Sequence, residues 1–475
     1  MEQHRQMNVY ELEQGFIPVM PQRRKEGRLG WKDWVNFRKN MLTIWTNKNY
    51  GAKRLSFNLL NQHYFVCNSS DTVRRVFLDK HNNYDRKSPQ MRNALAPLLG
   101  DGLFVSDGKL WRQRRKTCSP PFEKEFLPGF SLIMSNSAKE LVDSWQSVDD
   151  EIELDVLHEM ARLTAQIIGR TIFGDDIPKQ DLADVVNGFT EYQKTIDQSN
   201  LADTFGLPFL RYAVNPLSII KAKRATRKVH KVIDNIIDRY DKAEKTENLT
   251  LLSVLLDGDA GKSGRKGCPL SASNARSEAI VMFMAGHETT ANVLAWSWYL
   301  LDGCPRSKKR MYDEIDTVLK GRSIELCDVE NLPYTRAVFE ETLRLYPPVP
   351  VLSRQAKESD VMRSTDIHPG SIMLVLPWLL HRHDKEWSFP NTFYPERFLP
   401  TEPKPDKFIY IPFSVGPRVC LGLKFGLTEG IICLATIAQQ YNLSVAPGHK
   451  VDIECHLTLR PKDGLPMLIR KRSEI

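Results

Sequence analysis

Apolar and polar residues alternate along residues 53–67, with a break at Asn61-Gln62. A period of two is typical of strands and the polar break is typical of a turn, so this stretch predicts two strands joined by a turn. Short strands are expected again over residues 451–470, around Asp463-Gly464. Elsewhere apolar residues recur at spacings of three and four, which predicts helices. The segments with this spacing are 162–173, 221–240, 277–301 and 307–320.

Proline and glycine mark the connections between these elements. Residues 347–350 contain three prolines and are expected to end the helix that contains Glu341. Residues 390–412 are rich in proline and aromatic residues, which suits an irregular but packed meander. Residues 257–269 are glycine-rich and charged but lack the spacing of a phosphate-binding loop, so we expect a surface connector.

The chain has 475 residues, of which 41% are hydrophobic, and this is enough to bury a large core. It contains 66 basic and 58 acidic residues, so the net charge of +8 is modest and does not indicate a nucleic-acid partner. A basic run over residues 221–231 is expected to be the solvated face of a helix. No internal repeat or change of composition divides the chain, which predicts a single domain over residues 1–475.

The eight cysteines are scattered without a C-x-x-C pair, so neither a zinc cage nor a disulfide framework is expected. Reduced thiols in turn predict a cytoplasmic protein. The first 60 residues contain no apolar run longer than residues 15–20, which Pro18 interrupts. The sequence therefore predicts neither a secretory signal nor a membrane anchor in this part of the chain.

The most apolar segment, residues 279–301, is long enough to span a membrane, but its centre is polar: Gly286, His287, Glu288, Thr289, Thr290 and Asn292. An ionisable residue there is costly in lipid, so a buried helix beside a polar site is the better interpretation. Gly286 and the paired threonines are expected to weaken the helix and admit water or a ligand, with Thr290 bonded to backbone. On its own, the segment fits an ordinary core helix equally well.

A loop near the C-terminal end of the sequence presents a cysteine. It reads F-S-V-G-P-R-V-C-L-G over residues 413–422 and precedes an apolar helical run over residues 423–438. Gly416 and Pro417 predict a sharp turn, and Cys420 falls just before a helix start, where free N–H groups favour a thiolate. Such a thiolate is a metal ligand or a nucleophile. No histidine in a catalytic motif accompanies it, so we prefer ligation, with an inert buried cysteine as the alternative.

The loop fits the pattern F-x-x-G-x-R-x-C-x-G at every fixed position and resembles the haem-binding loop of the cytochrome P-450 monooxygenases. Four further segments resemble the family in the right chain order: W-R-Q-R-R at 111–115, A-G-H-E-T-T at 285–290, E-T-L-R at 341–344 and F-Y-P-E-R-F at 393–398. The resemblance extends from about Leu55 to the C-terminal end of the sequence.

The resemblance implies a mainly α fold, with a large helical domain, a small β-rich N-terminal region and the haem buried between helices. The parts expected to be helical are residues 71–345 and 376–445, and those expected to be rich in strands are about 50–70, 350–375 and 446–475.

By the same resemblance, Cys420 ligates the iron of haem b, iron protoporphyrin IX. A thiolate ligand pushes electron density into the iron and favours O–O bond cleavage. Phe413 packs near the thiolate, while Gly416 and Gly422 let the backbone approach the porphyrin and the helix behind it. The residues implied to meet the haem carboxylates are Trp111, Arg115, Arg354 and Arg418, and a contact from His383 stays open.

The resemblance also implies roles for two groups of polar residues. Thr289 and Glu288 occupy the positions of a proton relay for oxygen activation. A buried charge network, with a structural and not a catalytic role, is implied for Glu341, Arg344 and Arg397.

The implied reaction is hydroxylation of an apolar small molecule with O2 and two electrons. Only about fifty residues follow Cys420, too few for a flavin or iron–sulfur segment, so a separate ferredoxin or flavodoxin with its reductase is expected to supply the electrons. A candidate docking face for such an acidic partner consists of Arg112, Arg114, Arg115 and Lys116. With no N-terminal anchor expected, the protein resembles soluble bacterial members of the family.

The substrate is open at this point. Residues 102–108, together with the segment 285–290, resemble members that hydroxylate fatty acids and related lipids, and terpenoid, steroid and aromatic substrates are alternatives. The pocket loops expected to decide are 88–99, 192–209 and 349–352. Two other classes compete: a haem-thiolate protein that binds without hydroxylating, against which Thr289 and Glu288 argue, and a membrane or scaffolding protein built on the apolar helix.

Overall fold

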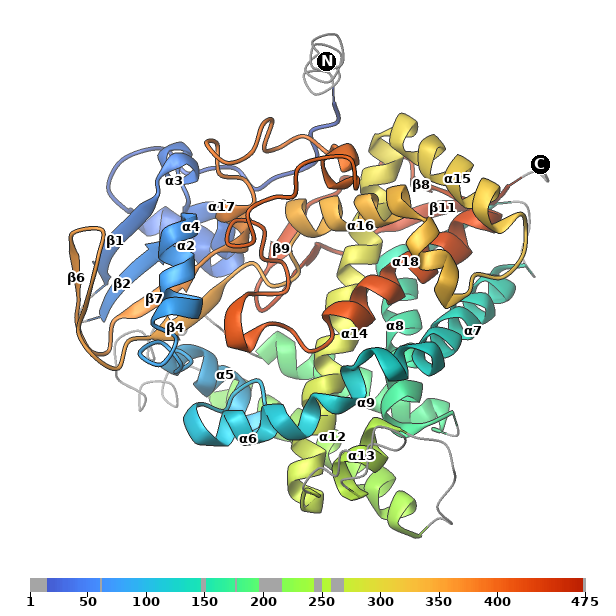
Figure 1. Ribbon diagram of the computed structural model, residues 1–475, viewed down its shortest axis with the longest axis horizontal. Coiled ribbons are helices and arrows are strands. Elements are labelled where there is room, and N and C mark those ends of the chain that lie inside the picture. Colours follow the sequence, from blue (N-terminus) through green and yellow to red (C-terminus); the bar gives the residue numbers. More distant parts are fainter. Residues whose placement is uncertain are drawn as a thin grey trace.

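The computed structural model describes residues 15–59, 62–146, 151–175, 177–195, 216–242, 250–257 and 269–472. Helices make up most of this part of the chain, and the strands form one larger group at the left of Figure 1 and smaller groups toward its centre and upper right. The helices are α2 (Trp31–Lys39), α3 (Asn47–Gly51), α4 (Ser70–Arg74), α5 (Pro89–Leu99), α6 (Gly108–Cys118), α7 (Leu127–Trp145), α8 (Val156–Phe173), α9 (Lys179–Thr195), α12 (Pro216–Lys242), α13 (Leu251–Asp257), α14 (Ala272–Gly303), α15 (Pro305–Leu319), α16 (Pro333–Leu345), α17 (Pro377–Leu380) and α18 (Leu423–Gln440). The mainly α expectation is confirmed.

The predicted hairpin is confirmed as β1 (Arg54–Leu59) and β2 (Gln62–Cys67), which pair antiparallel. Strand β2 continues in parallel with β7 (Ile372–Val375), which pairs with β4 (Leu352–Gln355). Two segments almost three hundred residues apart in sequence thus share one sheet. The remaining strands are β3 (Glu151–Asp155), β5 (Asp360–Met362), β6 (Thr365–Ile367), β8 (Tyr441–Val445), β9 (Ile453–Cys455), β10 (Leu459–Pro461) and β11 (Pro466–Lys471).

Several local predictions also hold. Helix α16 ends at Leu345, just before the proline-rich residues 347–350. The basic run over residues 221–231 lies on α12 with its lysines exposed and Val229 buried, as expected of a solvated face. Most of the glycine-rich segment 257–269 lies outside the described residues. Among the residues that the structure does describe, no helix is long and apolar enough to cross a membrane.

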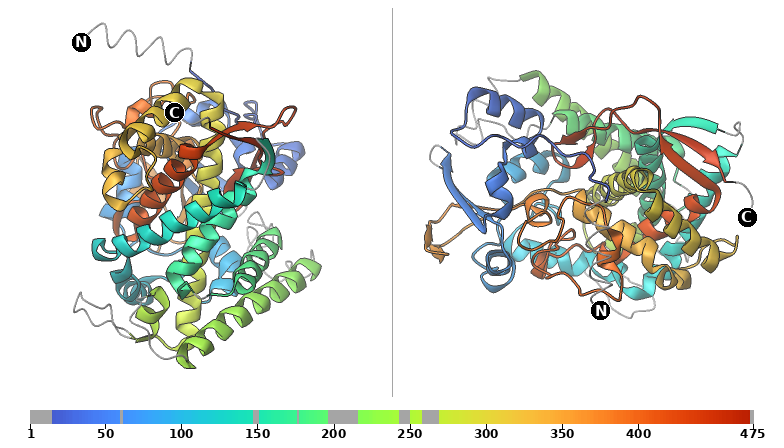
Figure 2. Two further views of the ribbon diagram at one scale, coloured as in Figure 1. Left: turned by 90° about the vertical axis from the view of Figure 1, so that its right-hand side faces the viewer. Right: turned by 90° about the horizontal axis from the view of Figure 1, so that it is seen from above.

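Helix α14 forms the axis of the helical part and is seen nearly end-on in the right-hand view of Figure 2. It is one unbroken helix of 32 residues, so the expected local opening is wrong. The reason lies in how Gly286 packs: a Cβ added there would lie 2.8 Å from the Ile168 side chain of α8. The missing side chain lets the two helices approach closely, and this contact offsets the roughly 1 kcal/mol that glycine costs in a helix.

The meander that precedes the cysteine loop is held by a buried ion pair. Arg344 donates two hydrogen bonds of 2.7 Å to the Glu341 carboxylate, and both side chains are fully buried. Arg344 also donates to the backbone carbonyls of His381, Pro390 and Thr392. Arg397 adds a contact of 3.2 Å to the same carboxylate. One charged cluster therefore ties α16 to chain segments some fifty residues further along.

Glu341→Gln should destabilise the protein by about 3–5 kcal/mol, because it leaves two buried guanidinium groups without their counter-charge. Urea unfolding of the holoprotein measures the loss. The matched control on the same helix is Arg336→Gln, which removes an ion pair whose arginine is half exposed and should cost less than about 1 kcal/mol. Equal effects of the two substitutions would contradict the role given to the buried cluster.

Candidate functional site

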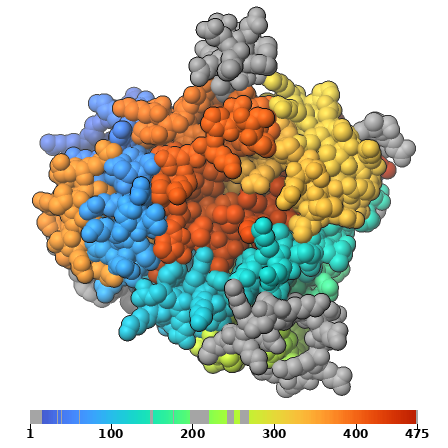
Figure 3. All heavy atoms as spheres, viewed as in Figure 1, coloured from blue at the N-terminus to red at the C-terminus, as the bar shows by residue number. Residues whose placement is uncertain are grey.

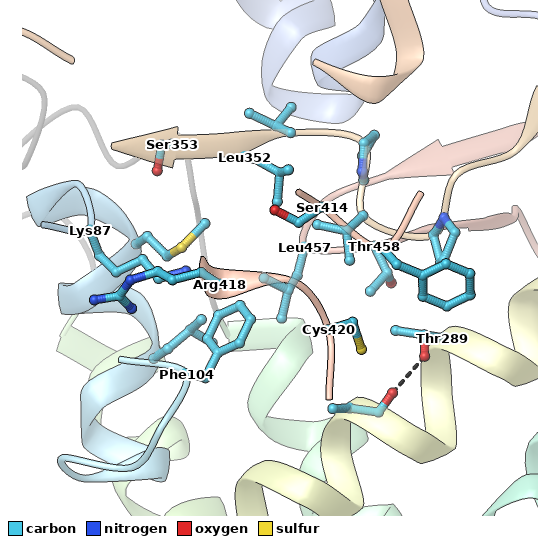
Figure 4. A pocket seen from close by; sticks show the side chains of 18 of the residues that line it. Lys87, Phe104, Thr289, Leu352, Ser353, Ser414, Arg418, Cys420, Leu457 and Thr458 are labelled. Atoms are coloured by element: carbon cyan, nitrogen blue, oxygen red, sulfur yellow. Dashed lines mark hydrogen bonds between the residues drawn. The ribbon is translucent and has the colours of Figure 1, made fainter. Parts of the chain in front are cut away.

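A cavity of about 640 Å³ lies between α14 and the cysteine loop (Figure 4). Its walls come from α5, α6, α14, β4, the loop over residues 413–422 and the turn between β9 and β10. Most of the lining side chains are apolar. Nine of the residues proposed from the sequence line this one cavity: Trp111, Arg115, Glu288, Thr289, Arg354, Phe413, Arg418, Cys420 and Gly422.

The cysteine loop is shaped by Gly416, which has a φ of +77°. A Cβ at this position would collide with the backbone carbonyl of Phe77. Gly416 does not line the cavity, although it was expected to let the backbone approach the porphyrin. Instead, the missing side chain lets the loop pack closely against residues 75–79. The loop closes with a hydrogen bond of 2.9 Å from the Cys420 N–H to the Phe413 carbonyl. This geometry presents Cys420 at the cavity wall.

The Cys420 side chain is exposed to the cavity, which itself lies deep in the protein. Burial raises the pKa of its thiol, while the N–H of Gly422 and the nearby Arg115 guanidinium lower it. Gly422 is the N-cap of α18, so the predicted place just before a helix start is confirmed. Positive partial charge at this end stabilises a thiolate, which is the form that binds metals.

Four cationic side chains line one region of the cavity: Lys87, Arg115, Arg354 and Arg418. Arg418 lies over the ring of Trp111, 4.3 Å from its centroid, and donates to the carbonyls of Ser106 and Asp85. Arg115 donates a hydrogen bond of 2.7 Å to the carbonyl of Val419, beside Cys420. Figure 4 shows Lys87 and Arg418 next to each other, away from Thr289.

These cations are in an unfavourable electrostatic environment. Burial, with Arg418 nearby, lowers the pKa of Arg354 to about 9. Burial and the two arginines also hold the pKa of Lys87 well below its usual range. The two nearest carboxylates, Asp85 and Asp107, are shared with cations outside the cavity, since Lys357 lies 3.3 Å from Asp85 and Arg92 pairs with Asp107.

Positive charge at a cavity wall favours an anionic ligand, and planar guanidinium groups suit carboxylates. The two carboxylates of a haem fit this end of the cavity, and the Cys420 sulfur on the same wall fits its iron. Lys87 is the one member of the set that sequence reasoning missed. The sequence around it, Tyr84-Asp85-Arg86-Lys87, gives no local signal of this position.

The two residues of the predicted proton relay, Glu288 and Thr289, lie on the α14 side of the cavity. Thr289 donates a hydrogen bond of 2.5 Å to the Ala285 carbonyl one turn earlier. Glu288 is buried and accepts hydrogen bonds from Thr458, at 2.6 Å, and from Gln193. Burial raises the pKa of Glu288, and these two partners and Arg460 oppose the shift.

Two further expectations are wrong, one for Thr290 on α14 and one for the basic residues of α6. The hydroxyl of Thr290 was expected to bond to backbone, but it lies beside the buried Glu429 carboxyl of α18, whose pKa burial raises to about 8. The face of four basic residues on α6 is reduced to Arg112 and Lys116, the two that are exposed. Arg114 is buried against Glu278 and Asn274, because the helix turns it inward, and Arg115 lines the cavity.

His383 does not line the cavity. It is fully buried, and its Nδ1 accepts a hydrogen bond of 3.2 Å from the Lys385 N–H. The loops over residues 88–99 and 349–352 do contribute lining residues, as expected. Of the third predicted pocket loop, residues 196–209 lie outside the described part of the chain.

A mainly helical protein with a cysteine and a cluster of buried cations on one apolar cavity has the features of a cysteine-ligated haem enzyme. Comparison with protein-family models gives a match to cytochrome P450 over residues 31–467. The chain belongs to the cytochrome P450 family. Members of this family are monooxygenases that bind haem b through a cysteine thiolate, so the chain is an enzyme and not a scaffolding protein built on the apolar helix.

Curated relatives agree with this assignment. The chain is 31% identical to cyclooctatin synthase of Streptomyces melanosporofaciens over 396 residues, which cover 82% of each chain. It is 27% identical to the Arabidopsis thaliana protein LUTEIN DEFICIENT 5, chloroplastic, over 89% of this chain and 72% of the relative. It is also 29% identical to cytochrome P450 4V2 of Rattus norvegicus, over 81% of this chain and 76% of the relative.

Gly416→Ala should prevent the loop from adopting its shape, since alanine is strained at this φ and its Cβ meets the Phe77 carbonyl. We expect a loss of stability of at least about 2 kcal/mol, with a fall in haem content. Gly422→Ala is the control, because its Cβ would meet only the Cys420 sulfur, at 3.9 Å, among the described residues. Thermal unfolding compares the two, and a stable Gly416→Ala protein would refute the packing argument.

Proposed function

We propose that Cys420 is the axial ligand of the haem iron and that Trp111, Arg115, Arg354 and Arg418, together with Lys87, bind the haem carboxylates. The observation that carries this proposal is that one cavity-exposed cysteine and four cations line the same cavity, with Lys87 and Arg354 buried and Arg115 and Arg418 partly buried. Phe413 lines the wall beside the sulfur and limits the access of water to it. Bound there, a cysteine-ligated haem supplies reductive activation of O2 and insertion of one oxygen atom into a substrate C–H bond.

The protein's part in the reaction is to bind the substrate, exclude water and deliver protons. The Thr289 hydroxyl lies on the cavity wall formed by α14 and can turn from the Ala285 carbonyl to donate a hydrogen bond into the cavity. Glu288 is the neighbouring acid, and burial raises the pKa of its carboxyl group, which favours the proton-carrying form. These two residues form the proposed proton relay.

Electrons are proposed to come from a separate ferredoxin or flavodoxin with its reductase. The cysteine loop and the start of α18 reach the face of the molecule shown in Figure 3, between the segments of residues 75–85 and α6. Arg112 and Lys116 on α6 are exposed and suit an acidic partner. The reaction is thus the hydroxylation of an apolar small molecule by O2 and two electrons.

Cys420→Ser should abolish the red-shifted Soret band of the reduced carbon monoxide complex, because a serine hydroxyl is a much weaker donor to iron than a thiolate. Cys327→Ser is the control, since Cys327 is exposed on the surface and should leave the band unchanged. Absorption spectra of the purified proteins make the comparison. A wild-type protein without haem, or a serine variant with an unchanged band, would overturn the proposal.

Thr289→Ala should keep haem and substrate binding but divert electrons from product to hydrogen peroxide, because the proton donor at the cavity wall is lost. We expect at least about a tenfold rise in peroxide formed per electron pair, within the range of general acid catalysis. Peroxide is measured against reductant consumed with a surrogate ferredoxin and reductase. Thr289→Ser restores the hydroxyl and should restore coupling, while an unchanged ratio in the alanine variant would reject the relay.

A further inference from the structure

The two ends of the cavity differ in charge. All four cationic residues among the described lining residues belong to the end proposed to hold the haem carboxylates. Apart from Cys420 and Tyr64, the only other ionisable groups on the described lining are Glu288 and His456. His456 lies 3.1 Å from the Glu454 carboxylate, which also pairs with Arg460. Neither of these two groups offers a free positive charge to a ligand.

The wall opposite the cations is built from α14 and the turn between β9 and β10. Glu288 on α14 accepts a hydrogen bond from Thr458 in that turn, and Leu457 beside it also lines the cavity. Figure 4 shows Leu457 and Thr458 on the same side of the cavity as the Cys420 and Thr289 side chains. A ligand lying against this wall meets apolar surface, the Glu288 carboxyl group and the hydroxyl-bearing residues Thr289, Thr290 and Thr458.

Such a wall discriminates strongly by charge. An ionised carboxylate taken out of water needs a cation or several hydrogen-bond donors, and the described residues of this wall include no cation with a free charge. An alcohol or a ketone needs only one partner and can share the hydrogen bonds of Glu288 or Thr458. The arrangement therefore favours neutral molecules over acids of the same shape.

We propose that the substrate enclosed by this cavity is an uncharged, apolar molecule carrying at most a hydroxyl or carbonyl group, and not an ionised fatty acid. This inference rests on the proposed function and narrows it, since it selects neutral hydrocarbon skeletons such as terpenoids over carboxylic acids. Glu288 and Thr458 supply the hydrogen-bonding partners for a polar group on such a molecule.

A matched pair of compact probes tests the proposal on the holoprotein at pH 8. The probes are 1-adamantanemethanol and adamantane-1-carboxylate, which share one rigid skeleton and are too short to place the polar group in solvent while the skeleton is enclosed. Binding is measured by the shift of the haem Soret band and by calorimetry. We expect the alcohol to bind at least about 100-fold more tightly than the carboxylate. Equal or tighter binding of the carboxylate would overturn the proposal.

A charge added to the same wall gives a second test. Leu457→Lys places a cation where the cavity has none among its described lining residues, and Leu457→Met is the control of similar length without charge. The lysine variant should bind adamantane-1-carboxylate at least about tenfold more tightly than the methionine variant, while 1-adamantanemethanol should not gain. No gain for the carboxylate would contradict the idea that missing positive charge excludes it.

These outcomes are separate from failure of the proposed function. A protein without haem, or without the red-shifted carbon monoxide band, would overturn the haem assignment. A protein with that band and a preference for the carboxylate would leave the haem assignment intact and overturn only the substrate class.

Discussion

Compensation of buried charge is the constraint on which this structure depends. Glu341 and Arg344 meet it internally, because every strong donor of Arg344 finds a carboxylate or carbonyl oxygen. The cations beside the cysteine do not. Burial and Arg418 lower the pKa of Arg354, burial and both arginines lower the pKa of Lys87, and the adjoining Asp107 is shared with Arg92 outside the cavity. A folded protein retains such a cluster of uncompensated cations where a bound anionic ligand supplies the missing negative charge. The same physical rule therefore explains a structural element and locates a binding site.

The two clusters are mechanically connected. Arg344 holds backbone carbonyls of the meander, and the meander runs directly into the loop that bears Cys420. Arg115 holds the other side of that loop through the Val419 carbonyl. The position of the sulfur is thus fixed by charged side chains on both sides, neither of which touches it. Precision at the site comes from elements that take no part in the chemistry.

Much of the fold and site could be predicted because its signals are local. The alternation over residues 53–67, the prolines after α16 and the fixed spacing around Cys420 all lie within short windows of sequence. The errors concern contacts between distant elements. The inward turn of Arg114 toward Glu278 and the place of Lys87 in the cation cluster depend on how helices pack, and no local pattern contains that information.

Gly286 shows how such a long-range contact changes a mechanistic interpretation. As a sequence feature it indicates a weak point in the helix, yet in the structure the Ile168 side chain of α8 packs directly against it. A helix clamped at this residue cannot readily bend to free Thr289. The hydroxyl can still leave the Ala285 carbonyl by rotation about χ1, since threonine in a helix populates two rotamers. Proton delivery then needs a single side-chain rotation, and an unbent helix keeps the hydrogen bond between Thr458 and Glu288 at the cavity wall.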